Sequence, residues 1–190
     1  MTLVAMRGLA VARNACATLL LGLVTLLHAP SQAQVTSDAQ TNERSVMAAY
    51  IYRFITYVEW PVSAFQSADA PIVIGVVNAD DIAAELEQIV QGRTAQSRRL
   101  LVRRIAPGEA ATGVNVLFIG GEASKFLQAK TLTDRSVLTI TERGIDQGSV
   151  INFVHVDGRV RFEVNVGVAE KSGLRLSSRL LTVATRVKAG

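Results

Sequence analysis

Residues 150–166 place the strongest constraint on the fold of this chain. They read VINFVHV-DG-RVRFEVNV, two runs of β-branched and aromatic residues on either side of Asp157-Gly158. An Asp-Gly pair between such runs is typical of a two-residue type I′ turn, whose twist matches that of the flanking strands. A two-residue loop also determines the register, so that Asn152 faces Glu163 and Val154 faces Arg161. The segment therefore predicts an antiparallel β-hairpin.

The predicted register gives the hairpin two unlike faces, because neighbouring side chains in a strand point to opposite sides. One face is apolar and is expected to belong to the core: Ile151, Phe153, His155, Val160, Phe162 and Val164. His155 is thereby expected to be a core histidine. The other face mixes valines with charged and amide residues: Val150, Asn152, Val154, Val156, Arg159, Arg161, Glu163 and Asn165. Either it is solvated and holds cross-strand ion pairs, or a helix of this chain or another protein covers it.

The N-terminus is typical of a secretory signal peptide. Arg7 and Arg13 precede an apolar run over residues 16–27, and Ser31 and Ala33 are small residues at the recognition positions. We expect cleavage after Ala33, export to the periplasm, a disordered leader over residues 34–43 and a single domain over residues 44–190. The apolar run does not predict a membrane span, which takes roughly 20 residues.

Loss of the signal peptide limits the chemistry of the exported chain. Cys16 is the only cysteine and His28 is one of two histidines, so His155 alone remains. Disulfides, thiolate nucleophiles and zinc sites of Cys and His are then excluded, and we expect no catalytic residue, metal or cofactor. Two of the 20 Lys and Arg residues also leave, and against 16 Asp and Glu the net charge is +2. A charge this small does not indicate nucleic-acid binding.

A long helix is expected before the first strand. Met47, Ile51 and Phe54 recur at helical spacing, which predicts a helix over residues 43–59 with Thr41 or Asn42 as its cap. Trp60-Pro61 is expected to end it, because the residue before a proline avoids the α region.

The rest of the chain alternates strands and helices. Apolar runs predict strands over residues 71–77, 114–119 and 137–141, and residues 98–105, which carry arginines at both ends, are predicted to form another strand. Helices are predicted over residues 80–91 and 121–130. A helical turn to residue 171 and a final helix from residue 177, which includes Val187, follow the hairpin. This order predicts an α/β fold, with a mostly parallel Rossmann-like sheet, flanking helices and the antiparallel hairpin over residues 150–166 at one side.

Polar and small residues follow two of the predicted strands. Asn78 and Asp80 follow the first strand, and Gly121 and Ser124 follow the third. In a sheet ordered 2-1-3-4, the crevice between the first and third strands is a usual ligand site. These four residues therefore form a candidate small-ligand site. The alternative is that Asp80 caps a helix and that residues 120–121 form a tight turn.

Several segments resemble a known family. These are residues 52–61 (YRFITYVEWP), 116–120 (VLFIG), 151–165 (INF…DGRVRFEVN) and 173–181 (GLRLSSRLL). They resemble the YfiR-like family of bacterial periplasmic regulatory proteins, over about residues 46–184. The resemblance implies a compact α/β domain that is often dimeric and is not an enzyme.

The resemblance also implies a function. In the best-known members the protein restrains an inner-membrane diguanylate cyclase by touching its periplasmic sensor part. An outer-membrane lipoprotein draws the repressor away, which raises cyclic di-GMP and promotes biofilm. We therefore expect a homodimeric periplasmic regulator that binds a membrane-bound cyclase or another membrane sensor. The alternative is a periplasmic small-ligand sensor or solute-binding module that uses the crevice.

Candidate partner-binding residues come from the positions that match the family and from the mixed face of the hairpin. They are Phe153, Val154, Arg159, Arg161, Glu163, Asn165, Ser178 and Leu181. Each of them either contacts a partner or packs the fold, and the sequence leaves both possibilities open.

Overall fold

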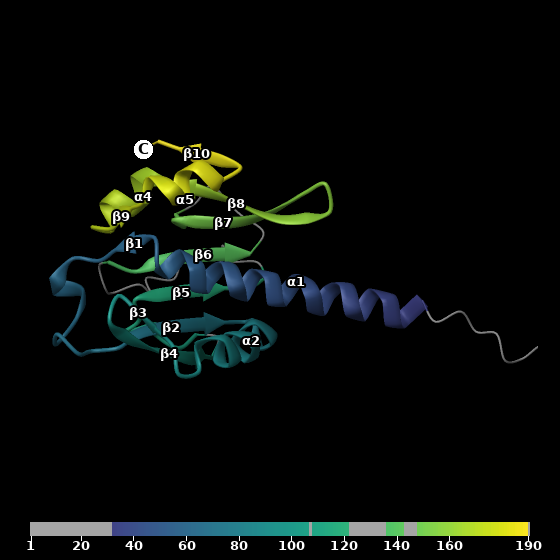
Figure 1. The fold of residues 1–190 in the computed structure, drawn as a ribbon, viewed down its shortest axis with the longest axis horizontal. Helices are drawn as coiled ribbons and strands as arrows, with labels where there is room; N and C mark the ends of the chain where they lie inside the picture. The colour runs from purple at the N-terminus through teal and green to yellow at the C-terminus, as the bar shows by residue number, and fades with distance from the viewer. Residues whose placement is uncertain (1–31, 107, 122–135, 143–147, 190) are drawn as a thin grey trace, which may run out of the picture. The chain divides into compact units, whose positions relative to one another are not determined.

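The computed structural model describes residues 32–106, 108–121, 136–142 and 148–189 (Figure 1). The chain divides into two units, Met1–Ala39 and Gln40–Gly190. The predicted signal peptide lies outside the described residues except for its last two. No helix in the described ranges has the length and apolarity that a membrane crossing requires.

One sheet of eight strands organises the second unit, in the order β10-β8-β7-β6-β5-β2-β4-β3. The pairs from β4 through β2, β5 and β6 to β7 are parallel, whereas β7 and β8 are antiparallel. The strands are β2 (Ile72–Val77), β3 (Thr94–Ala95), β4 (Arg98–Ile105), β5 (Val116–Ile119), β6 (Leu138–Glu142), β7 (Ile151–Val156), β8 (Arg159–Asn165) and β10 (Arg186–Lys188). The predicted α/β class and the predicted order of the first four long strands are confirmed.

The hairpin has the predicted turn and register. Asp157 and Gly158 have φ values of 51° and 68°, the left-handed pair that a type I′ turn needs. Asn152 pairs with Glu163 and Val154 with Arg161. The division of the hairpin into two unlike faces is therefore confirmed, except that Val150, predicted on the mixed face, is fully buried and belongs to the core.

The inner face of the sheet, defined as the face that meets helices α1 (Gln32–Ile55) and α2 (Asp80–Val90), is apolar from β4 to β8. Figure 1 shows the later part of α1 lying across β5 and β6, with α2 beside β2 and β4. Tyr50 and Phe54 of α1 meet Phe153 and Phe162 of the hairpin, and the Phe54 and Phe162 ring centroids are 4.7 Å apart. Edge-to-face packing of buried rings adds to the stability gained from apolar burial.

The outer face, on the opposite side of the sheet, changes character along the strand order. Over β2, β5 and the end of β4 it is apolar and forms a second, smaller core: Val77, Ile105, Ala111, Val114, Leu117, Ile119 and Val137. Earlier in β4 the same side presents Arg99, Arg103 and Leu101, which is 48 % exposed. From β6 onward it becomes polar, beginning with the buried threonines Thr139 and Thr141. The helix predicted over residues 121–130 lies outside the described residues, apart from Gly121.

The first helix differs from its prediction at both ends. It begins at Gln32, so the leader predicted to be disordered over residues 34–43 is helical, and neither Thr41 nor Asn42 is its cap. Residues 34–43 contain no glycine or proline, and a helix extends cheaply from a stable segment because each added residue gains one hydrogen bond.

The helix also ends earlier than predicted. Residues 58 and 59 form strand β1 (Val58–Glu59), which pairs with β9 (Arg175–Leu176). Gln96 closes the helix end, because its Nε2 donates to the carbonyl oxygens of Ile55 and Val58 at 2.9 and 2.6 Å. A one-turn 3₁₀ helix, η1 (Val62–Ala64), follows Pro61.

The C-terminal segment contains less helix than predicted. The helical turn α4 (Val166–Lys171) is confirmed, but the last helix, α5 (Ser178–Val183), ends before Val187. Val187 instead lies in β10, in parallel register with Val164 of β8. The free edge of β8 offers backbone hydrogen-bonding groups that a continued helix would leave unpaired.

Candidate partner-binding face

The outer hairpin face comprises the side chains that point away from α1 on β7, β8 and the adjoining β10. Its residues are Asn152, Val154, Val156, Arg159, Arg161, Glu163, Asn165, Arg186 and Lys188. The β10–β8 register brings Arg186 beside Glu163 and Lys188 beside Asn165, so the face extends to the edge of the sheet. Figure 1 shows these strands at the top of the sheet, beside α4 and α5.

The outer hairpin face combines exposed apolar surface with charge. Val156 is 38 % exposed, Val154 is half-buried, and Arg159 is exposed at the end of the hairpin. The face contains four cations, Arg159, Arg161, Arg186 and Lys188, and one carboxylate, that of Glu163. It is therefore basic, with two valines among the charges.

Charged side chains on this face form hydrogen bonds within it. Arg186 Nη2 donates to Glu163 Oε2 at 2.8 Å, and Arg161 Nη1 donates to the carbonyl oxygen of Val160 at 3.2 Å. Since the one carboxylate is already paired, the field outside the face is positive. Such a surface complements an acidic surface on another macromolecule.

Two predicted partner-binding residues have internal roles. Phe153 is only 2 % exposed and packs against Phe54 and Phe118, so its side chain offers no contact surface. Asn165 lies at the edge of the face, but its Oδ1 accepts from Val168 N at 3.1 Å and caps α4. Matching a family position does not separate such packing and capping roles from binding.

The other predicted partner-binding residues fall into two groups. Val154, Arg159, Arg161 and Glu163 lie together on the outer hairpin face. Ser178 and Leu181 lie on α5, where Ser178 is exposed and Leu181 packs partly against the inner core. Arg186 and Lys188 were missed as members of the face, because the sequence predicted a helix where β10 lies.

His155 is not the core histidine that the sequence predicted. It is on the expected face, but the hairpin extends past the core there and the side chain is 45 % exposed. Its Nε2 lies 2.8 Å from Glu43 Oε1 on α1. Position on an apolar face does not ensure burial at the end of a strand, where α1 meets the strand through polar side chains.

Arg44 of α1 lies at the carboxyl edge of the sheet, between Asp81 after β2 and Glu142 at the end of β6. The sequence suggested a ligand crevice at this edge, between β2 and β5. Arg44 pairs with Glu142, whose side chain is buried, and its Nε lies 3.0 Å from Asp81 Oδ2. Glu142 also accepts from Gly121 N at 3.2 Å. Sequence reasoning missed this cluster, although Arg44 precedes Met47 and Ile51 at helical spacing and so shares their face of α1.

Of the predicted crevice residues, Asn78 and Gly121 lie side by side, since a Cβ on Gly121 would lie 3.0 Å from Asn78 Nδ2. Asp80 is 93 % exposed at its side chain and lies 3.6 Å from Arg104, whereas Asn78 Nδ2 donates to Gly120 O at 3.3 Å. Ser124 lies outside the described residues. A Cβ on Gly120 would meet Asn78 O at 2.5 Å, which shows how closely the two turns approach. In the described ranges, no cluster of His, Cys, Asp or Glu is placed to hold a metal ion.

The fold and this face define a class: an α/β protein whose sheet ends in a hairpin with one buried face and one charged, partly apolar face. A family model described as YfiR/HmsC-like matches residues 44–185, well over half of the 190-residue chain. The chain therefore belongs to the YfiR/HmsC-like family. The search of curated proteins found no match.

Proposed function

We propose that this protein is a periplasmic regulator that restrains a membrane-bound diguanylate cyclase, and thereby cyclic di-GMP signalling, by protein contact and without catalysis. The family assignment supports this function, and the N-terminal sequence pattern supports export. An outer-membrane lipoprotein that competes for the regulator, and a homodimeric form of it, belong to the same proposal.

The observation that carries the proposal is the character of the outer hairpin face. Valines 154 and 156 keep exposed apolar surface although the inner face already supplies the core of the hairpin. Beside them, on β8 and β10, lie four cations and a single carboxylate. Apolar groups in a patch supply binding energy, whereas neighbouring charges set the orientation and the rate of encounter.

Small-ligand binding at the crevice is a weaker proposal for this chain. Arg44 joins α1 to Glu142 and Asp81 at the ends of the strands, which leaves fewer free polar groups for a ligand. Sensing of a solute at that crevice would have to break these ion pairs.

The proposal is tested by exchanging two charges on the outer hairpin face. Deletion of the gene should raise cyclic di-GMP, and the native gene should restore the lower level. The double variant Arg161→Glu with Glu163→Arg keeps the net charge but reverses the local field and places a second guanidinium beside that of Arg186. It should fail to restore the lower level, as measured by mass spectrometry of cell extracts.

A matched control separates a lost contact from a general effect of charge. Arg53→Glu with Glu170→Arg exchanges the same two residue types at exposed positions outside this face and should restore the lower level. Circular dichroism should show native-like melting for both double variants. Unchanged cyclic di-GMP in the deletion strain, or full restoration by the outer-face variant, would contradict the proposal.

A further inference from the structure

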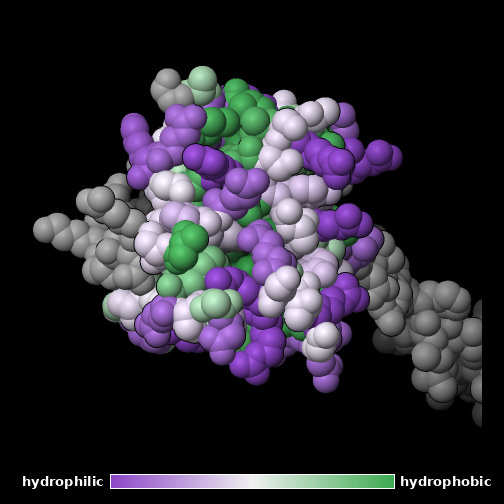
Figure 2. All heavy atoms as spheres, turned by 60° about the vertical axis from the view of Figure 1, so that its left-hand side comes forward, coloured by the Kyte–Doolittle hydropathy of each residue, from purple (hydrophilic) through white to green (hydrophobic). Residues whose placement is uncertain are grey.

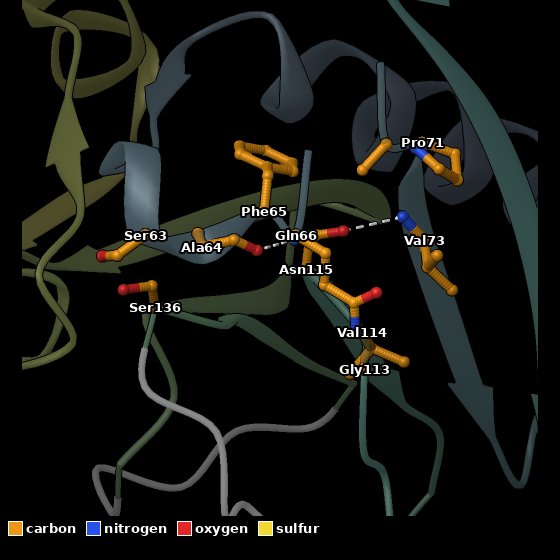
Figure 3. A pocket seen from close by; sticks show the side chains of 11 residues that line it. Ser63, Ala64, Phe65, Gln66, Pro71, Val73, Gly113, Val114, Asn115 and Ser136 are labelled. Atoms are coloured by element: carbon orange, nitrogen blue, oxygen red, sulfur yellow. Dashed lines mark hydrogen bonds between the residues drawn. The ribbon is translucent and has the colours of Figure 1, made fainter. Parts of the chain in front are cut away.

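A pocket of about 610 Å³ lies at the amino ends of β2, β5 and β6. This is the opposite end of the sheet from Arg44 and Glu142. The segment around η1 forms one wall, and the residues just before β5 and β6 form the other (Figure 3). Its volume is within the range of pockets that bind small molecules. Figure 2 brings this end of the molecule forward and shows hydrophobic and hydrophilic side chains intermixed.

Asn115 fixes the two walls relative to each other. It is 7 % exposed, its Oδ1 accepts from Val73 N at 2.9 Å, and its Nδ2 donates to Ala64 O at 3.2 Å. Both ends of the amide are used, so Asn115 builds the pocket and is not left to bind a ligand. A cavity held by such a bond is organised before any ligand arrives, which lowers the ordering cost of binding.

Arg98 fixes the loop that closes the same wall. Its Nη1 donates to the carbonyl oxygens of Ser67 and Ala70 at 3.1 and 2.7 Å, and its guanidinium lies 3.7 Å from the ring centroid of Phe65. Ser67 Oγ in turn donates to Asp69 Oδ1 at 2.6 Å, and this bond holds the pKa of Asp69 below its usual range. The carboxylate of Asp69 therefore stays ionised at neutral pH within the loop.

Two hydroxyl groups in the pocket have no partner among the described residues. Ser63 and Ser136 make no hydrogen bond through their side chains to any residue in the described ranges, and Figure 3 shows their hydroxyls side by side, at the same side of the pocket. Ser136 is only 8 % exposed, and its φ of 71° is a conformation that non-glycine residues rarely adopt. Strained residues of this kind cluster at binding sites, where the surrounding structure maintains them.

The lining determines what kind of molecule fits. Phe65, Pro71 and Val73 present apolar surface, Ser63 and Ser136 present hydroxyls, and none of the described residues that line the pocket has an ionisable side chain. A charged ligand would lose hydration there without gaining an ionic partner from these residues. We propose that this pocket binds a small uncharged molecule with an amide or hydroxyl group, held between Ser63 and Ser136, and a ring or short aliphatic part that packs on Phe65. This site goes beyond the proposed regulatory contact and does not depend on it.

Benzamide and benzoate provide the test, because they have the same shape and differ in charge. Chemical shifts of the backbone amides are followed by NMR in the purified protein as each probe is added. A probe of this size binds on the order of 1–10 mM in a well-formed pocket. Benzamide should shift the amides of Ser63, Gly113 and Ser136, and benzoate should bind roughly tenfold more weakly. Unmoved amides at about 10 mM benzamide would overturn the proposal.

A double variant tests the two hydroxyls directly. Ser63→Ala with Ser136→Gly removes both, and glycine accepts the positive φ at position 136 without strain, so the fold should be kept. Benzamide should bind roughly tenfold more weakly to it. Ser178→Ala removes an exposed serine hydroxyl on α5 and should leave the affinity unchanged. Equal affinity of the double variant and the native protein would overturn the role of these serines.

Discussion

The inner and outer faces of the sheet are built from the same strands, yet they differ in burial and in charge. In β8, Val160, Phe162 and Val164 point inward and are buried, while Arg161 and Glu163 alternate with them and point outward. The inner face is apolar from β4 to β8 and belongs to one core. The outer face is apolar over β2, β5 and the end of β4 and is charged over the hairpin.

This difference separates residues that hold the fold from residues that are free to bind. Inner-face side chains contact α1 or α2, so changing them leaves cavities or unpaired charges. On the outer hairpin face Glu163 pairs with Arg186 at the surface, so changing such side chains alters a surface. The comparison predicts large losses of stability on one face and small losses on the other.

The largest effect is expected for Phe162→Ala on the inner face. Phe162 is 2 % exposed and packs against Tyr50 and Phe54, so truncation removes buried apolar surface and leaves a cavity. We expect a loss of about 3–5 kcal/mol in the free energy of unfolding, measured by urea denaturation. Val154→Ala, on the outer face of the partner strand, should cost less than about 1 kcal/mol. Similar losses for the two variants would remove the distinction between the faces.

A smaller effect is expected at the polar end of the inner face. Arg44→Ala leaves the carboxylate of Glu142, which is 5 % exposed, without its cationic partner. The Arg44 side chain keeps 18 % exposure, so we expect a loss of about 2–4 kcal/mol, slightly below that of a fully buried pair. The double variant Arg44→Met with Glu142→Leu should recover much of this loss in the same denaturation experiment. If the double variant is no more stable than Arg44→Ala, the loss of stability comes from the missing ion pair and not from the unpaired carboxylate of Glu142.

The smallest effects are expected on the outer hairpin face. Asn165→Ala removes the cap of α4 and should cost about 1 kcal/mol. Glu163→Gln weakens an exposed ion pair with Arg186 and should cost less than about 1 kcal/mol, an effect that high salt should diminish. Thermal melts at low and high salt measure both. A large loss for Glu163→Gln would mean that this face also supports the fold.

Local signals made much of the fold predictable. The Asp157-Gly158 turn and the alternation around it gave the register of β7 and β8, because a short loop leaves few ways to pair the strands. Runs rich in apolar residues located β2, β5 and β6, and the apolar centre of β4 located that strand. Strands β1, β3, β9 and β10 were missed, since each is only two or three residues long. Strands β1, β9 and β10 also exist through pairing with a segment distant in sequence.

The candidate site was predictable only in part. The register alone brought Val154, Arg161 and Glu163 together, as the structure shows. The exposure of His155, the burial of Phe153 beneath α1 and the pairing of Arg44 with Glu142 depend on where α1 crosses the sheet. Periodicity shows which side chains share a face, but not how far along the strand a covering helix reaches.

The sequence by itself determined the alternation of strands and helices, the hairpin register and the set of side chains on each face, because these follow from the backbone repeat and from turns of two residues. Only the tertiary structure decided which of those faces is covered, which charges are paired and where the pocket near Ser136 forms. Those properties arise from contacts between segments far apart in the chain, whose free energies depend on three-dimensional packing rather than on local order.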